Sequence, residues 1–121
     1  MISRRILVAT SLATAALAAP AGLAWAHHGW SGYDSSKLVR LEGTVQAVSF
    51  DNPHAQVTLR TEPKVWRLVL APPSRMQSRG LPEGSVEVGE AVTVEGYPHR
   101  QDAEEFRCER IIVKGKTVEL R

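Results

Sequence analysis

Short runs in which apolar and polar residues alternate constrain the fold of this 121-residue chain more than any other feature. Within residues 39–45 every second residue is apolar or glycine, which is the period-2 pattern of a half-buried strand. The apolar residues Val48 and Phe50 then fall on the opposite parity. One extra residue near Ala47 explains this change, as in a β-bulge where a long strand bends around a small barrel.

Further alternating runs follow, separated by turn residues such as Asp51-Asn52-Pro53. Three strands, a short helix and two more strands form the order of an OB-type five-stranded barrel. A small open sandwich fits nearly as well, and both alternatives are all-β. We expect strands at residues 55–60, 65–70, 91–97 and 106–113, a short helix at 75–79 capped by Ser74, and an extended segment at 117–120.

The first 26 residues have the three parts of a cleavable export signal. Arg4 and Arg5 supply positive charge, residues 6–23 are apolar and uncharged, and Ala24-Trp25-Ala26 provides the small-x-small pattern before a cleavage site. A membrane anchor is the alternative, because the uncharged stretch approaches the length that spans a bilayer. Its mild hydrophobicity favours cleavage and predicts a periplasmic protein without a membrane contact, exported by the Sec or the twin-arginine route.

This interpretation divides the chain into a signal peptide (1–26), an extended N-terminal arm (27–37) and the barrel domain (38–121). The whole chain has 15 Lys and Arg against 13 Asp and Glu, and two of the arginines lie in the signal. The mature part is therefore neutral, so we expect no nucleic-acid partner. The single cysteine, Cys108, can form no internal disulfide, and we expect it in the core.

Sequence motifs for catalysis are missing. The chain has no glycine-rich phosphate loop, no GxSxG elbow, no HExxH and no CxxC pattern. Glu104 and Glu105 form a carboxylate pair on a charged loop, where solvated side chains are the usual outcome. We therefore expect a binding protein and not an enzyme.

The histidines indicate a different chemistry. His27 and His28 are adjacent at the predicted new N-terminus, and His54 follows Asn52-Pro53 at the head of the second predicted strand. Cleavage after Ala26 would give His27 a free α-amine beside its imidazole, and these two nitrogens can chelate one metal ion. A third nitrogen would complete a tetragonal face suited to Cu(II). The predicted metal ligands are His27, His28 and His54, with copper favoured.

Each histidine also has a simpler interpretation. The pair His27 and His28 can be a polar tail, because chain termini are usually disordered unless they are tied down. In the alternation of the second predicted strand, His54 falls on the side that faces away from the core. In that position it can simply stabilise its turn. His99 is the weakest candidate of the four histidines.

Two aromatic residues, Trp30 and Tyr33, follow the histidine pair. They can dock the arm onto the barrel by burying their rings, or they can contact a partner. Docking is the expectation, because a metal site shared between arm and barrel needs an arm that stays in place.

Four motifs occur in order along the chain, namely His27-His28, Leu41-Glu42-Gly43-Thr44-Val45, Asp51-Asn52-Pro53-His54-Ala55 and Gly96-Tyr97-Pro98. This pattern resembles the small exported bacterial proteins grouped as DUF6152, with Phe50 where tryptophan is usual. The resemblance covers essentially the whole chain and implies export and a compact β domain of uncharacterised function. It includes His27, His28 and His54 and leaves out His99.

The sequence therefore favours an exported β-barrel protein that binds a transition metal in the periplasm. The alternative is a metal-free adaptor module, which would hold a periplasmic protein or a small ligand with a barrel face or with the aromatic arm. An enzymatic role, such as that of a copper oxidant, is a more distant third.

Overall fold

The computed structural model describes residues 30–121. The predicted signal peptide, its cleavage site and the residues His27 and His28 lie outside the described residues. The described elements are the 3-10 helix η1 (Trp30–Gly32), strands β1 (Val39–Ser49), β2 (Gln56–Arg60) and β3 (Val65–Val69), helix α2 (Pro73–Ser78), and strands β4 (Ala91–Pro98), β5 (Glu105–Val113) and β6 (Lys116–Glu119).

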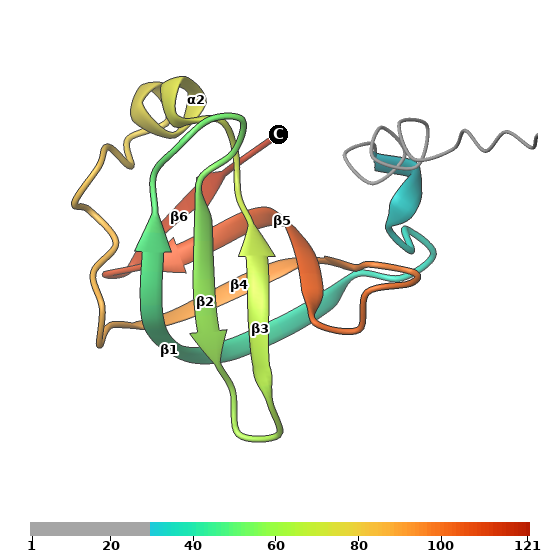
Figure 1. Cartoon of the computed structure of the whole chain (residues 1–121). Coiled ribbons are helices and arrows are strands. Elements are labelled where there is room, and N and C mark those ends of the chain that lie inside the picture. Colours follow the sequence, from blue (N-terminus) through green and yellow to red (C-terminus); the bar gives the residue numbers. More distant parts are fainter. Residues whose placement is uncertain (1–29) are drawn as a thin grey trace, which may run out of the picture. The chain divides into compact units, whose positions relative to one another are not determined.

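Five of these strands close into a barrel. Strand β1 pairs with β2 and β4, β2 pairs with β3, and β4 pairs with β5, all in the antiparallel sense. The parallel pairing of β3 with β5 closes the barrel, and β6 extends the sheet beyond β5. Figure 1 shows β1 bending strongly between its two partners, with α2 following β3 at one end of the barrel. The expected OB-like barrel with one short helix is confirmed, and the open sandwich was wrong.

The bend in β1 coincides with a bulge. Val45 pairs with Leu59 and Ala47 pairs with Thr58, so Gln46 is the extra residue on β1. A bulge increases the local twist and lets one strand turn from one partner to another. The irregularity predicted near Ala47 is therefore confirmed.

The core is formed by the inward positions of the alternating strands. Cys108 is fully buried there, as expected, and burial raises the pKa of its thiol. Trp66 and Phe106 add an edge-to-face ring contact with 5.6 Å between centroids. The largest fully buried side chains are Phe106, Leu59, Leu68, Leu70, Met76, Ile111, Leu120, Val45, Val57, Val94 and Cys108.

Two glycines of the family pattern are required by close packing of the barrel backbone. A Cβ on Gly43 would overlap the carbonyl oxygen of Arg60, and a Cβ on Gly96 would overlap that of Arg107. Gly96 lies beside the irregularity between β4 and β5, where Glu95 pairs with Arg110. These motif residues therefore serve the fold, because the strands approach each other too closely for a side chain.

The short helix begins earlier than the sequence indicated. Helix α2 starts at Pro73, and its N-cap is Pro72, which makes no side-chain capping hydrogen bond. The prediction of Ser74 as the N-cap was wrong, because a proline in the first turn has a suitable φ and no N–H to satisfy. Gly80 follows the helix with a φ of +96°, as expected for a glycine stop. Across residues 30–121 no helix is long and apolar enough to cross a membrane.

Candidate functional site

The one predicted metal ligand within the described residues, His54, lies at the head of β2. The next residue, Ala55, is buried, and His54 itself is half-buried. Strand β2 begins two residues later, and in its register Thr58 pairs with Arg67 on β3, which pairs with Glu105 on β5, so these three residues share the outer face. His54 has the parity of Thr58, and the buried Ala55 separates it from β2. His54 therefore points away from the core, as its position in the alternation predicted.

The same outer face carries a partly buried polar cluster that we call the Tyr33 clasp, formed by Tyr33, Arg67, His99, Asp102 and Glu105. The Tyr33 hydroxyl donates a hydrogen bond to Oε2 of Glu105. Arg67 donates to Oε1 of Glu105 at 3.0 Å and to Oδ2 of Asp102 at 2.5 Å. Both carboxylate oxygens of Glu105, whose side chain is only 7 % exposed, are therefore engaged.

Burial and ion pairing set the charge states in the clasp. Burial raises the pKa of Tyr33, and the hydrogen bond to the Glu105 carboxylate raises it further. The Glu105 partner raises the pKa of Arg67. The backbone N–H of Glu104 and the Arg67 guanidinium lower the pKa of Asp102 despite its partial desolvation. At neutral pH the phenol of Tyr33 is thus neutral, and the Arg67 guanidinium and the Asp102 carboxylate are charged.

His99 closes the clasp from the loop between β4 and β5. Its Nδ1 accepts hydrogen bonds from the backbone N–H groups of Gln101 at 3.1 Å and Asp102 at 3.0 Å. The proton of the neutral ring is therefore on Nε2, and that nitrogen has no lone pair for a metal ion. The ring meets Tyr33 edge to face, with 5.0 Å between centroids. His99 thus fixes its loop and packs against Tyr33 in a form unsuited to metal ligation.

Backbone hydrogen bonds tie the same segment to the barrel. The N–H of Arg100 donates to the carbonyl of Gly32 at 2.7 Å, and the N–H of Asp34 donates to the carbonyl of Pro98 at 2.8 Å. Residue 32 must be small, because a Cβ there would come within 2.9 Å of Nε2 of His99. The expected docking of Tyr33 is therefore confirmed. Trp30, by contrast, is 41 % exposed.

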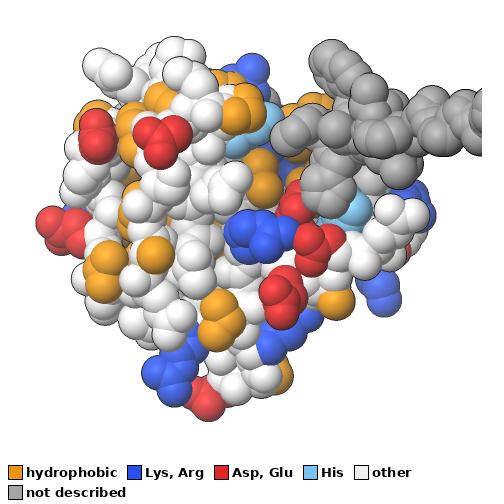
Figure 2. Space-filling model, in the orientation of Figure 1, with side chains coloured by type: hydrophobic (Ala, Val, Ile, Leu, Met, Phe, Trp, Pro, Cys, Tyr) orange, Lys and Arg blue, Asp and Glu red, His pale blue; other side chains and the backbone are white. Residues whose placement is uncertain are grey.

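A second charged group continues the outer face along β5. Arg107 and Arg121 both approach Oε2 of Glu109, at 3.4 and 3.8 Å. Burial lowers the pKa of Arg121 to about 10, and the neighbouring Arg107 lowers it further while Glu109 opposes the change. Acidic and basic side chains also lie next to one another on the face of the molecule shown in Figure 2. This interspersed charge agrees with the neutral composition.

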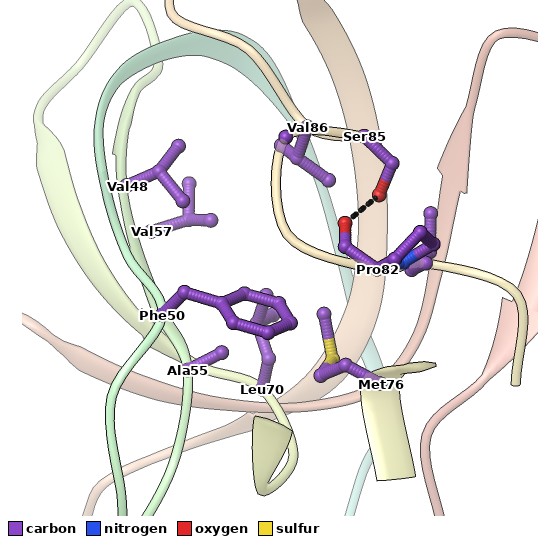
Figure 3. A pocket seen from close by; sticks show the side chains of 11 residues that line it. Val48, Phe50, Ala55, Val57, Leu70, Met76, Pro82, Ser85 and Val86 are labelled. Atoms are coloured by element: carbon purple, nitrogen blue, oxygen red, sulfur yellow. Dashed lines mark hydrogen bonds between the residues drawn. The ribbon is translucent and has the colours of Figure 1, made fainter. Parts of the chain in front are cut away.

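An apolar pocket lies at the end of the barrel near α2. Phe50, Leu70 and Met76 point toward its centre, with Val48 and Val86 on the opposite side (Figure 3). Its one internal polar contact in the view is the hydrogen bond from the Ser85 hydroxyl to the Pro82 carbonyl, 2.6 Å long. None of the residues that line this pocket is ionisable.

The described residues alone do not assemble a metal centre. Within residues 30–121 no three His, Cys, Asp or Glu side chains come together in a group that could hold a metal ion. His54 is the one predicted ligand in this range, and the other two, His27 and His28, fall outside it.

Sequence reasoning missed most of the clasp. Glu105 was expected to be solvated together with Glu104, but it is buried while Glu104 is exposed. His99 was placed last among the histidines, although it is 8 % exposed and packs against Tyr33. One signal was present, because Glu105 precedes the inward Phe106 and so belongs to the outer side of a strand. Its burial depends on the arm, which no local pattern reveals.

The fold and this outer face define a small OB-like barrel protein in which residues 32–34 are held on the barrel by the Tyr33 clasp. The chain belongs to DUF6152, a family of unknown function, and the match covers residues 13–106. The family expected from the motifs is therefore confirmed. No curated protein matches the chain.

Among solved structures, the chain is similar to two of TiaS. One is the TiaS-tRNA(Ile2)-ATP complex, with a TM-score of 0.48, 18 % identity, and coverage of 70 % of this chain and 19 % of that one. The other is a ZRD-deleted mutant of TiaS in complex with agmatine, with a TM-score of 0.48, 17 % identity, and coverage of 70 % and 24 %. This chain thus spans less than a quarter of the length of either match.

Proposed function

We propose that this protein is a periplasmic metal-binding protein, exported by its N-terminal signal, that holds a transition metal through His27, His28 and His54. It binds and does not turn over a substrate. Copper is the favoured metal, because an α-amine and imidazoles form the nitrogen-rich set that suits Cu(II). Cleavage after Ala26 supplies the amine, which loses its proton readily when a metal ion competes for it.

One observation carries this proposal: the sequence places two adjacent imidazoles, His27 and His28, directly after the predicted cleavage site. The third predicted ligand, His54, is half-buried beside the buried Ala55 just before β2. The donor set of amine and imidazole nitrogens fits the metal.

The test uses the processed protein recovered after export, without a tag. N-terminal sequencing first checks that the chain begins at His27. Titration with Cu(II), followed by the d–d absorption band and EPR, should show one ion bound per chain with sub-micromolar affinity. Blocking the amine by one added N-terminal residue, and the substitution His54→Ala, should each weaken binding by at least about tenfold, since each removes one nitrogen ligand.

A matched control is Gln56→Ala, at the next outward position of β2. It should leave copper affinity unchanged. Micromolar or weaker binding that ignores both the blocked amine and His54→Ala would contradict the proposal. In that case the metal-free adaptor module becomes the better proposal.

A further inference from the structure

We propose that the end of β1 and the apolar pocket beside it form a peptide-docking site. The occupant is an extended segment of a partner protein that carries an aliphatic side chain with Lys or Arg near it. This segment adds as a strand to the edge of β1. The site shares no residue with the predicted metal ligands, so the inference is independent of the proposed function.

The first observation is an inward side chain that stays exposed. Val48 pairs with Val57 on β2, and directly opposite residues of two antiparallel strands lie on the same face of the sheet. Val57 is 1 % exposed, whereas Val48 is 37 % exposed. The described residues therefore leave the inner face of the sheet open at the end of β1, where an apolar side chain from another molecule would be buried.

The second observation is the edge of β1 beside this opening. One edge pairs with β2, and on the other edge the pairing with β4 ends at Thr44. Backbone hydrogen bonds then join Val45 to Gly89 and Glu90, at 2.8 and 2.9 Å. Among the described strands, none pairs with this second edge over residues 47–49, which are exposed. An open strand edge of this kind binds an extended peptide through its main chain.

The pocket next to this edge accounts for the aliphatic side chain. Val48 lies on one side of the pocket and Val86 on the other, while Phe50 and Met76 point toward its centre (Figure 3). A strand added to β1 would alternate its side chains between the two faces of the sheet, so one set would point toward this pocket. Met76 can adapt to the occupant, because its side chain is unbranched and flexible.

Acidic residues surround the pocket. Asp51, Glu83 and Glu87 are exposed, and each is next in sequence to a residue that lines the pocket. The Ser49 hydroxyl donates a hydrogen bond to Oδ2 of Asp51 at 3.0 Å, which keeps this carboxylate at the end of β1. We call these three residues the acidic rim.

The cations near the acidic rim offset it only in part. Lys114 lies 3.3 Å from Glu90, its closer carboxylate partner. Lys116 donates a hydrogen bond to the carbonyl of Gly80, and Arg79 of α2 donates to backbone carbonyls of β6 and of the residues after it. The rim therefore keeps an excess of negative charge, and charge complementarity favours Lys or Arg in the partner segment.

The experiment titrates the exported, processed protein, freed of metal by a chelator, with short synthetic peptides. These peptides alternate Thr with Val, Leu or Ile and carry Lys at both ends. Matched peptides have Glu at both ends, or are N-methylated at every central amide so that they cannot pair with a strand edge. Calorimetry measures affinity, and hydrogen exchange at residues 47–49 reports strand addition.

Two variants test the named residues, each with a matched control. Val48→Thr removes apolar surface from the pocket, and its control is Val65→Thr, at a valine of β3 that is 43 % exposed. Glu83→Lys reverses one charge of the acidic rim, and its control is Glu62→Lys, at an exposed position between β2 and β3. All four positions are exposed, so the barrel is expected to stay folded.

We expect the Lys-ended peptides to bind and to slow exchange at residues 47–49. Val48→Thr and Glu83→Lys should each weaken binding about fivefold, and the two controls should not. No binding by any Lys-ended peptide, or equal binding of the Glu-ended or N-methylated peptides, would overturn the proposal. Self-association in sedimentation that Val48→Thr abolishes would overturn it as well, because the occupant would then be a second copy of this chain.

Discussion

Two networks of arginine and carboxylate side chains lie on the outside of this barrel, and they differ in burial. The first is a partly exposed ladder, formed by Arg40, Glu95, Arg110 and Glu119 across β1, β4, β5 and β6, with side chains 22–53 % exposed. In it Arg110 reaches Glu95 at 2.7 Å and Glu119 at 2.9 Å, and Arg40 reaches Glu95 at 3.0 Å. The second is the Tyr33 clasp, in which the central Glu105 is almost fully buried.

The comparison shows that pairs of arginine and carboxylate side chains contribute differently to stability depending on their burial. Exposed ion pairs add little to stability, because water and salt screen them and their side chains lose entropy. A buried carboxylate, by contrast, must have a partner for each oxygen, and removal of one member leaves an unsatisfied charge or donor. The ladder therefore lies on a sheet that other contacts already stabilise. The clasp, by contrast, fixes residues 32–34 on the barrel.

The largest effect should follow from Glu105→Ala. Loss of the carboxylate leaves the Tyr33 hydroxyl buried without its acceptor and weakens the hold on Arg67, and this should lower the free energy of unfolding by about 3 kcal/mol. Urea denaturation checks the value. Glu104→Ala, one residue earlier and exposed, should change stability little; equal effects of the two would remove the distinction between clasp and solvated loop.

A smaller effect is expected for Tyr33→Phe. The ring and its packing against His99 remain, so the loss is that of one hydrogen bond to a charged acceptor, or about 2 kcal/mol. Thermal or urea unfolding measures it, with Tyr97→Phe as the matched variant. If the two tyrosine variants lose the same stability, the hydroxyl of Tyr33 has no special role.

The clasp should also respond to alkaline pH. Folding raises the pKa of Tyr33 above its ordinary value of 10.0, so the stability from its neutral form is fully present below pH 10.0 and is lost as the pH rises toward the folded-state pKa. The stability difference between the unaltered protein and Tyr33→Phe should therefore shrink above pH 10.0. Urea denaturation at several pH values tests this, and a difference that grows with pH would contradict the assigned hydrogen bond.

The smallest effect should come from the ladder. Arg110 and Arg40 lower the pKa of Glu95, so its charge contributes stability that is present at neutral pH and lost on acidification through the folded-state pKa. Glu95→Gln should nevertheless shift the unfolding midpoint only slightly. The shift should disappear at ~1 M salt, where the Debye length is ~3 Å. If Glu95→Gln lowered the free energy of unfolding as much as Glu105→Ala, the ladder and the clasp would not differ in their contribution to stability.

The strands of the barrel could be predicted because the residue pattern that specifies each strand lies within that strand. The alternation in residues 39–45, the phase change near Ala47 and the inward side chains of β2 follow from a period that one strand carries by itself. The cap of α2 was mispredicted, because serine at position 74 looked like a better cap than two successive prolines.

The candidate site was predictable only in part. The outward position of His54 follows from the β2 alternation, and the docking of Tyr33 was inferred from its aromatic ring. The clasp partners His99 and Glu105 were not, because they lie at the two ends of the connection from β4 to β5 and meet Tyr33, more than 60 positions earlier in the chain. A contact of this kind exists only after the barrel has closed, and no run of neighbouring residues encodes it.

The measurement that tests the central claim most directly is pulsed EPR of the exported, processed protein loaded with one equivalent of Cu(II). We expect nitrogen ligation by the terminal amine and by imidazoles, with the number of imidazoles falling by one in His54→Ala and staying unchanged in Gln56→Ala. A copper spectrum that is the same in His54→Ala and the unaltered protein, or no specific binding at all, would show that the N-terminal nitrogens and His54 do not form a metal site.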